Sequence, residues 1–287
     1  MDTSINSPVL NELVEPLLAI CAAAGDAILA HYHAPDAAQY SDKGNDTPLT
    51  AADLAADAII KHGLEVLTPA IPILSEESAP GERREQRSWE QYWLIDPLDG
   101  TQEFLDRTGE FTVNVALIQA HKPVLGVLYV PLESQAYVGI PGQSAKKYAS
   151  TEGIWHSTPL RCCRLEEGKP LKVLASHRHR SERLRSLLAW LDQSWVGHTR
   201  SNSGSALKFA HMSEGQGDFY PRFSTCCEWD TAAGQAVVEA AGGAVLGMDG
   251  QPLRYNTRDS LYSPYFYAIA DAQHSLWAQL IERELGL

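Results

Sequence analysis

The spacing of apolar residues near the N-terminus predicts two helices. Ser7-Pro8 is typical of a helix start, and apolar residues then recur every three or four positions to about Tyr32. Pro16 lies inside this helix and is expected to kink it. A polar loop is expected over 40–48. Thr50-Ala51-Ala52-Asp53 resembles a capping box and is expected to begin the second helix.

Short apolar runs in the next hundred residues predict a largely antiparallel sheet. The predicted strands are Ile71 to Leu74, Tyr92 to Ile95, Phe111 to Gln119, Val124 to Val130 and Ala136 to Ile140. The last three strands are joined by short connections, which favour antiparallel neighbours. The region from Pro141 to Pro170 is rich in turn-forming and charged residues, so we expect it to be mostly loop.

The second half of the sequence alternates between strand and helix patterns. The predicted strands cover Leu171 to Ala175, Trp195 to His198, Asp218 to Tyr220, Ala244 to Leu246 and Tyr265 to Ile269, and the predicted helices cover Ser181 to Leu191, Ser205 to Met212, Asp230 to Gly242 and Asp271 to about Leu285. This alternation favours a partly parallel sheet covered by helices. We therefore expect an N-terminal α+β subdomain over 1–152 and a C-terminal α/β subdomain over 153–287.

Composition narrows the class of partner. The formal net charge of −13 argues against binding a nucleic-acid polymer, which usually requires a basic surface. The five cysteines include two adjacent pairs and no C-x-x-C motif, which favours a reduced intracellular protein. No segment has the features of a signal peptide, and no apolar run is expected to reach the length of a membrane span.

Potential metal and phosphate ligands are most concentrated in one segment, directly after a predicted strand. Its sequence is Asp96-Pro97-Leu98-Asp99-Gly100-Thr101. Two carboxylates, a backbone carbonyl and water are ligands that Mg²⁺ prefers. Taken alone, the segment is equally typical of a tight turn, because Pro fixes φ and Gly permits positive φ.

Two further acidic segments also allow either a metal-binding role or a purely structural one. Glu76-Glu77 follows a predicted strand, and Asp230 begins a predicted helix. The first is compatible with a solvated loop and the second with a helix N-cap. Asp53, at the start of the second helix, is likewise typical of an acid that favours the helix dipole. The basic segment His177-Arg178-His179-Arg180 is compatible with a solvated loop or with a contact to a phosphate.

Taken together, these segments resemble the inositol monophosphatase superfamily of Mg²⁺-dependent, lithium-sensitive phosphatases. The resemblance rests on Leu74-Ser75-Glu76-Glu77-Ser78, on 96–101 and on Trp229-Asp230-Thr231-Ala232-Ala233-Gly234. Four other segments resemble its bacterial branch of 3'(2'),5'-bisphosphate nucleotidases. They are 96–104, Gly109-Glu110-Phe111-Thr112-Val113-Asn114, Ser205-Ala206-Leu207-Lys208-Phe209 and Tyr220-Pro221-Arg222-Phe223. The implied fold is a layered αβαβα sugar-phosphatase architecture.

The resemblance implies a role for each matching residue. Glu76, Asp96, Asp99, Asp230 and the Leu98 carbonyl would hold two or three Mg²⁺ ions. Asp53 would pair with the Thr101 hydroxyl to polarise the attacking water, with Glu77 supporting that water. The substrate would contact Glu76, Leu98, Asp99, Gly100, Thr101, Gly204, Ser205, Lys208, Arg222 and Asp230. Of these, the backbone N–H groups of Gly100 and Thr101 would bind the phosphate, and Arg222 would face a second phosphate.

The implied reaction is Mg²⁺-dependent hydrolysis of the 3'-phosphate of adenosine 3',5'-bisphosphate to AMP, with possible action on its 5'-phosphosulfate relative in sulfate assimilation. A phosphate near several carboxylates is repelled until cations intervene, so metal dependence also follows from charge. Alternatives are an inositol monophosphatase and a non-enzymatic Mg²⁺ or nucleotide sensor. We expect a cytoplasmic monomer or homodimer, with peripheral binding to the cytoplasmic face of the inner membrane as an open alternative.

Overall fold

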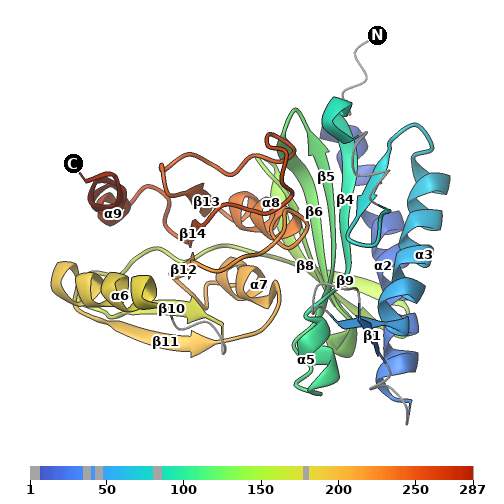
Figure 1. Cartoon of the computed structure of the whole chain (residues 1–287), viewed down its shortest axis with the longest axis horizontal. Helices are drawn as coiled ribbons and strands as arrows, with labels where there is room; N and C mark the ends of the chain where they lie inside the picture. Colours follow the sequence, from blue (N-terminus) through green and yellow to red (C-terminus); the bar gives the residue numbers. More distant parts are fainter. Residues whose placement is uncertain (1–6, 35–39, 43–47, 80–85, 177–180, 287) are drawn as a thin grey trace.

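The computed structural model describes residues 7–34, 40–42, 48–79, 86–176 and 181–286, and it contains two main β-sheets (Figure 1). A seven-stranded sheet has the order β3-β4-β5-β6-β7-β8-β9, and a five-stranded sheet has the order β11-β10-β12-β14-β13. The strands of the first sheet are β3 (Ile73–Ser75), β4 (Gln91–Asp99), β5 (Thr112–Gln119), β6 (Lys122–Val130), β7 (Gln135–Ile140), β8 (Ser144–Thr151) and β9 (Ile154–Pro159). Those of the second are β10 (Leu171–Ala175), β11 (His198–Asn202), β12 (Phe219–Arg222), β13 (Ala244–Gly247) and β14 (Phe266–Ile269).

Helices cover both faces of the two sheets, which gives five layers. The helices are α1 (Ser7–Glu12), α2 (Val14–Tyr32), α3 (Ala51–Leu67), α5 (Thr101–Leu105), α6 (Glu182–Ser194), α7 (Leu207–Ser213), α8 (Ala232–Ala240) and α9 (Ser275–Leu285). Helices α2 and α3 pack on one face of the seven-stranded sheet, and α7 and α8 lie between the sheets. Helices α6 and α9 cover the outer face of the five-stranded sheet. The predicted αβαβα architecture is confirmed.

The alternation of side chains along β4 explains how one strand serves two cores. Trp93 and Ile95 contribute to the core beneath α2 and α3, whereas Tyr92 and Leu94 contribute to the core around α8. Successive side chains of a strand point to opposite faces, and both faces of this sheet are covered. Such a strand reads as a continuous apolar run rather than as an alternating one.

Several elements of the structure differ from those predicted from the sequence. The region expected to be loop contains β8 and β9, and the strand expected over 195–198 lies instead at His198–Asn202. Within the polar loop expected over 40–48, Tyr40–Asp42 pairs with Pro48–Thr50 as a short hairpin, β1 and β2. Gly153 lies in the turn between β8 and β9, so the seven-stranded sheet continues past it. The division of the chain at this point stays a prediction.

The N-terminal helix is interrupted near Pro16, where the sequence predicted a kink, and it differs from its prediction in one other respect. Its regular hydrogen bonding is interrupted at Leu13, because Pro16 has no N–H to donate to the carbonyl of Glu12. Among the described residues, Val9–Tyr32 is long and apolar enough to cross a membrane by length and composition, contrary to the sequence expectation. Its apolar side chains, such as Leu17 and Ile28, are buried against the sheet, as in a core helix.

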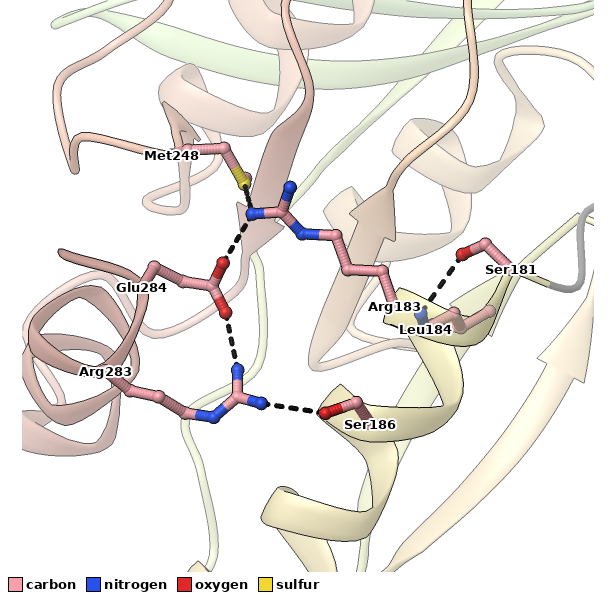
Figure 2. A network of polar contacts seen from close by, with 7 residues as sticks. All are labelled: Ser181, Arg183, Leu184, Ser186, Met248, Arg283 and Glu284. Atoms are coloured by element: carbon pink, nitrogen blue, oxygen red, sulfur yellow. Dashed lines mark hydrogen bonds and ion pairs between the residues drawn. The ribbon is translucent and has the colours of Figure 1, made fainter. Parts of the chain in front are cut away.

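A polar network ties the last helix to α6 (Figure 2). Glu284 of α9 accepts from Arg183 and Arg283 at 2.5 Å each, and Arg283 also donates to Ser186 at 3.1 Å. Ser181 caps α6 by accepting from the backbone N–H of Leu184. These contacts fix the outer helical layer over the five-stranded sheet.

Candidate active site

The end of β4 departs from regular pairing, and this departure positions two acids. Asp96 pairs with Asn114 and Asp99 pairs with Thr112, with a register shift between them. Pro97 cannot donate a ladder hydrogen bond, and Asp96 Oδ1 accepts from the backbone N–H of Leu98 at 3.1 Å. The irregular strand end therefore brings the two carboxylates to one side.

A parallel neighbour supplies the next acid. Strand β3 pairs with β4 so that Ser75 lies opposite Ile95, and the N–H of Glu76 donates to the Ile95 carbonyl at 3.1 Å. The hydroxyl of Ser75 donates to Asp57 at 2.5 Å and accepts from the N–H of Glu77 at 3.1 Å. This anchored turn places Glu76 beside the end of β4.

The remaining acid comes from a distant part of the sequence. Asp230 precedes α8, and its Oδ2 accepts from the N–H of Cys227 at 2.7 Å. One carboxylate oxygen each from Asp96, Asp99 and Asp230 lie within 4.8 Å of one another. Three of the acids that the sequence singled out therefore meet in space, and their roles as metal ligands stay a prediction.

The electrostatics of this cluster suit a cation. Burial raises the pKa of Asp96 well above its usual range, and repulsion from Glu76, Asp99 and Asp230 adds to the effect. Burial, followed by repulsion from Asp99 and Glu76, raises the pKa of Asp230 to about 7. Several carboxylates held together in a buried site favour either protonation or a bound cation. The donor set consists of hard oxygen atoms, so it fits Mg²⁺.

Asp99 is held in place by donors from both halves of the chain. Its Oδ2 accepts from the hydroxyl of Ser205 at 2.8 Å, the N–H of Ala206 at 2.6 Å and the amide of Asn114 at 3.3 Å. The hydroxyl of Thr112 lies 2.8 Å from both Asn114 Oδ1 and Ser205 Oγ. With Oδ2 satisfied in this way, Oδ1 is the oxygen left for a cation.

Gly100 is required by both its backbone angle and its surroundings. Its φ is +92°, and an added Cβ would lie 2.9 Å from the carbonyl oxygen of Glu110 and 3.2 Å from Ser205 Cβ. The Thr101 hydroxyl donates to the Leu98 carbonyl at 3.2 Å. The expected pairing of Thr101 with Asp53 stays a prediction.

These residues open into a cleft of about 400 Å³ between the two sheets. Its lining includes most of the residues that the sequence singled out, namely Glu76, Asp96, Leu98, Asp99, Gly100, Thr101, Ser205, Lys208, Arg222 and Asp230. Asp53, Glu77 and Gly204 do not line it. Asp53 is buried close enough to Asp96 for its charge to raise the pKa of that residue. An added Cβ at Gly204 would lie 2.8 Å from Glu103 Cγ.

The two cations of the cleft differ in how their polar atoms are used. Lys208 is buried, and its ammonium donates to the carbonyls of Ser203 at 3.0 Å and Ser205 at 2.6 Å. Burial, reinforced by Arg222, lowers the pKa of Lys208 to about 8. Arg222 donates through Nη2 to the Thr225 carbonyl at 3.3 Å. Its Nε is buried without a hydrogen-bond partner among the described residues.

Comparison with known proteins places this site in a family. The sequence matches the inositol monophosphatase family over residues 9–284. The chain belongs to the inositol monophosphatase family. It is 41% identical to 3'(2'),5'-bisphosphate nucleotidase CysQ of Salmonella typhimurium, over 88% of this chain and 98% of that protein. It is 42% identical to the CysQ of Escherichia coli K12, over 85% and 94%.

Solved structures agree with the family assignment. A CysQ from Bacteroides thetaiotaomicron, described as a bacterial member of this family, superposes with a TM-score of 0.76 at 35% identity, over 90% of this chain and 97% of that one. An inositol monophosphatase of Thermotoga maritima has a TM-score of 0.73 at 17% identity, over 96% and 98%, and therefore supports the fold alone.

The sequence did not indicate a functional role for two residues beside the acidic cluster. Thr112 and Asn114 lie in a segment quoted for the family likeness, yet their contacts with Asp99 and Ser205 appear only in the structure. A polar residue at every second position of an otherwise apolar strand is the signal that could have found them. The basic segment 177–180 lies outside the described residues, although Ser176 before it lines the cleft.

Proposed function

We propose that this chain is a Mg²⁺-dependent 3'(2'),5'-bisphosphate nucleotidase that hydrolyses the 3'-phosphate of adenosine 3',5'-bisphosphate to give AMP. The observation that carries the proposal is Arg222, which lines the acidic cleft beside Asp99 and Asp230 and forms no ion pair with a carboxylate among the described residues. A guanidinium that lines a cleft without a carboxylate partner favours an oxyanion ligand. A substrate with two phosphates would place one at the acids and the other at Arg222. The similarity to CysQ nucleotidases supports the same assignment.

The proposed chemistry divides the labour among the residues of the cleft. Glu76, Asp96, Asp99, Asp230 and the Leu98 carbonyl would hold two or three Mg²⁺ ions. Bound Mg²⁺ would offset the negative charge of carboxylates and phosphate and lower the pKa of a water molecule. Thr101 and Asp53 would orient the attacking water, and Glu77 would support it. Gly100 leaves room for the phosphate to approach backbone N–H groups.

Substrate recognition would come from the segment around α7 and from β12. Lys208 fixes the Ser203–Ser205 backbone and adds positive charge, while Arg222 would bind the 5'-phosphate. Gly204 and Ser205 would lie against the nucleoside. Action on the 5'-phosphosulfate relative, a place in sulfate assimilation, a cytoplasmic location and a monomeric or dimeric state are parts of the same proposal.

A phosphate-release panel tests the proposal. With Mg²⁺, adenosine 3',5'-bisphosphate should be hydrolysed with a higher kcat/KM than inositol 1-phosphate or fructose 1,6-bisphosphate. Arg222→Ala should raise KM for the bisphosphate by about tenfold, while hydrolysis of 3'-AMP, which lacks the second phosphate, should change little. Faster turnover of inositol 1-phosphate, or equal losses on both nucleotides, would contradict the assignment.

A further inference from the structure

A second cleft, of about 610 Å³, lies at the other end of α8. It is bounded by the start of β8, the segment 159–164, the C-terminal end of α8 and the segment 270–273. No residue lines both clefts. Since α8 begins two residues after Asp230 and has nine residues, the second cleft lies about 14 Å further along the helix axis. It is therefore a separate site.

The described lining of this cleft carries more positive than negative charge. Lys146, Arg161 and Arg164 line it with exposed side chains, and none of the three forms an ion pair or a side-chain hydrogen bond with a described residue. Their neighbours in sequence behave differently. Lys147, beside Lys146, pairs with Glu214 at 2.8 Å. Three unpaired cations on one cleft are unexpected in a chain with a net charge of −13.

The polar groups beside these cations are already used or uncharged. Asp271 is the one carboxylate in the lining, and its Oδ2 accepts from the N–H of Leu165 at 3.2 Å. Burial raises the pKa of both Cys162 and Cys163 to about 12, so neither thiol adds negative charge at pH 7. Three cations and one carboxylate leave the cleft with a net positive charge.

We infer that this second cleft binds a small anion that carries phosphate or sulfate groups, at a site separate from the active site. Guanidinium groups present paired N–H donors that match the oxygen atoms of phosphate and sulfate. The volume lies within the range of small-molecule sites. Because the cations are supplied by the protein itself, binding here needs no metal ion, unlike phosphate binding at the acidic cleft.

Calorimetric titration of the full chain in EDTA at low salt tests this inference. Without metal, the acidic cleft repels anions, so the second cleft should dominate. Wild-type protein should bind pyrophosphate in a saturable way, and Arg161→Ala/Arg164→Ala should bind it at least tenfold more weakly. A parallel titration with sulfate shows whether the cleft prefers phosphate or sulfate groups. A titration with chloride at matched ionic strength controls for electrostatic screening.

Two control variants make the outcome decisive. Lys122→Ala/Arg185→Ala removes two other exposed cations, also unpaired among described side chains, and should leave pyrophosphate affinity within twofold. Arg222→Ala should also leave it unchanged. No saturable binding to wild type, an equal loss in both double variants, or a loss confined to Arg222→Ala would overturn the inference. The Arg161→Ala/Arg164→Ala variant should keep wild-type phosphatase activity.

Discussion

The two clefts at the ends of α8 differ in the sign of the charge that lines them. The acidic cleft gathers carboxylates from β4 and from the start of α8, and Asp96 among them is buried. The second cleft holds exposed cations that belong to β8 and to the segment that follows β9. Buried charge of one sign is costly without a counterion, whereas exposed charge is stabilised by water. On the two proposals above, the first cleft would require a cation before it could accept an anion, and the second would not.

Among the variants that test this difference, Asp96→Asn should have the largest effect. Removing one charge from the cluster should reduce phosphate release by at least ~10³-fold, because metal-assisted stabilisation of the transition state contributes several kcal/mol. The fold should persist, and in EDTA the midpoint of thermal unfolding should rise because burial disfavours the Asp96 carboxylate. Phosphate release and circular dichroism melting are the measurements.

The same variant separates the two clefts. Pyrophosphate binding in EDTA should be unchanged in Asp96→Asn, since the second cleft shares no lining residue with the first. Wild-type turnover by Asp96→Asn would remove the acidic cluster from the mechanism. A parallel loss of pyrophosphate binding would show that the two clefts are one functional unit.

The sequence was sufficient to identify the acids of the cluster, but not all of the residues that hold them in place through hydrogen bonds. Asp96 and Asp99 directly follow an apolar run, and a strand end with turn residues can be read from local sequence alone. Ser205 reaches Asp99 across 106 positions in the sequence, and Asn114 reaches it only because of the β4–β5 register shift. Neither contact has a local signature, since both depend on how distant segments pair.

The missed strands have a related cause. Strand β9 forms the edge of the sheet, next to β8, and all of β9 except Trp155 is exposed. An edge strand that buries little has no need for alternating apolar residues, so its pattern resembles a loop. The same holds for β11, an edge strand whose residues are polar and, from Thr199 to Asn202, exposed. Hydropathy consequently favoured the apolar residues just before it.

A pH experiment sharpens the comparison through stability. The pKa of Asp230 in the folded, metal-free protein is raised to about 7 from an ordinary value of 3.8. The folded state then binds a proton that the unfolded state releases, so stability should be lost as pH rises between these values. We expect unfolding free energy in EDTA to fall by at least ~1 kcal/mol between pH 5 and pH 8.

Mg²⁺ provides the control for that experiment. Because the ion replaces the proton, it should raise the unfolding midpoint more at pH 8 than at pH 5. Asp230→Asn should flatten the pH dependence in EDTA. A profile that is equally steep in the variant would assign the effect to other groups, and no Mg²⁺ stabilisation at pH 8 would contradict a metal site at these acids.

The smallest expected effect concerns how the acidic cleft is held open for its cation. The buried Thr112 hydroxyl contacts Asn114 and Ser205, both of which donate to Asp99. Thr112→Val keeps the shape but removes the hydroxyl, and one or two lost hydrogen bonds at about 1 kcal/mol each should weaken Mg²⁺ binding by about tenfold. Thr112→Ser retains the hydroxyl and should bind Mg²⁺ like the wild type. Calorimetric titration with Mg²⁺ and the Mg²⁺ dependence of phosphate release check both variants.

At saturating Mg²⁺, KM for the nucleotide should be unchanged in Thr112→Val, because the hydroxyl acts on Asp99 rather than on the substrate. Equal losses in the two variants would instead make Thr112 a packing residue, and the acidic cleft would then depend on its carboxylates alone.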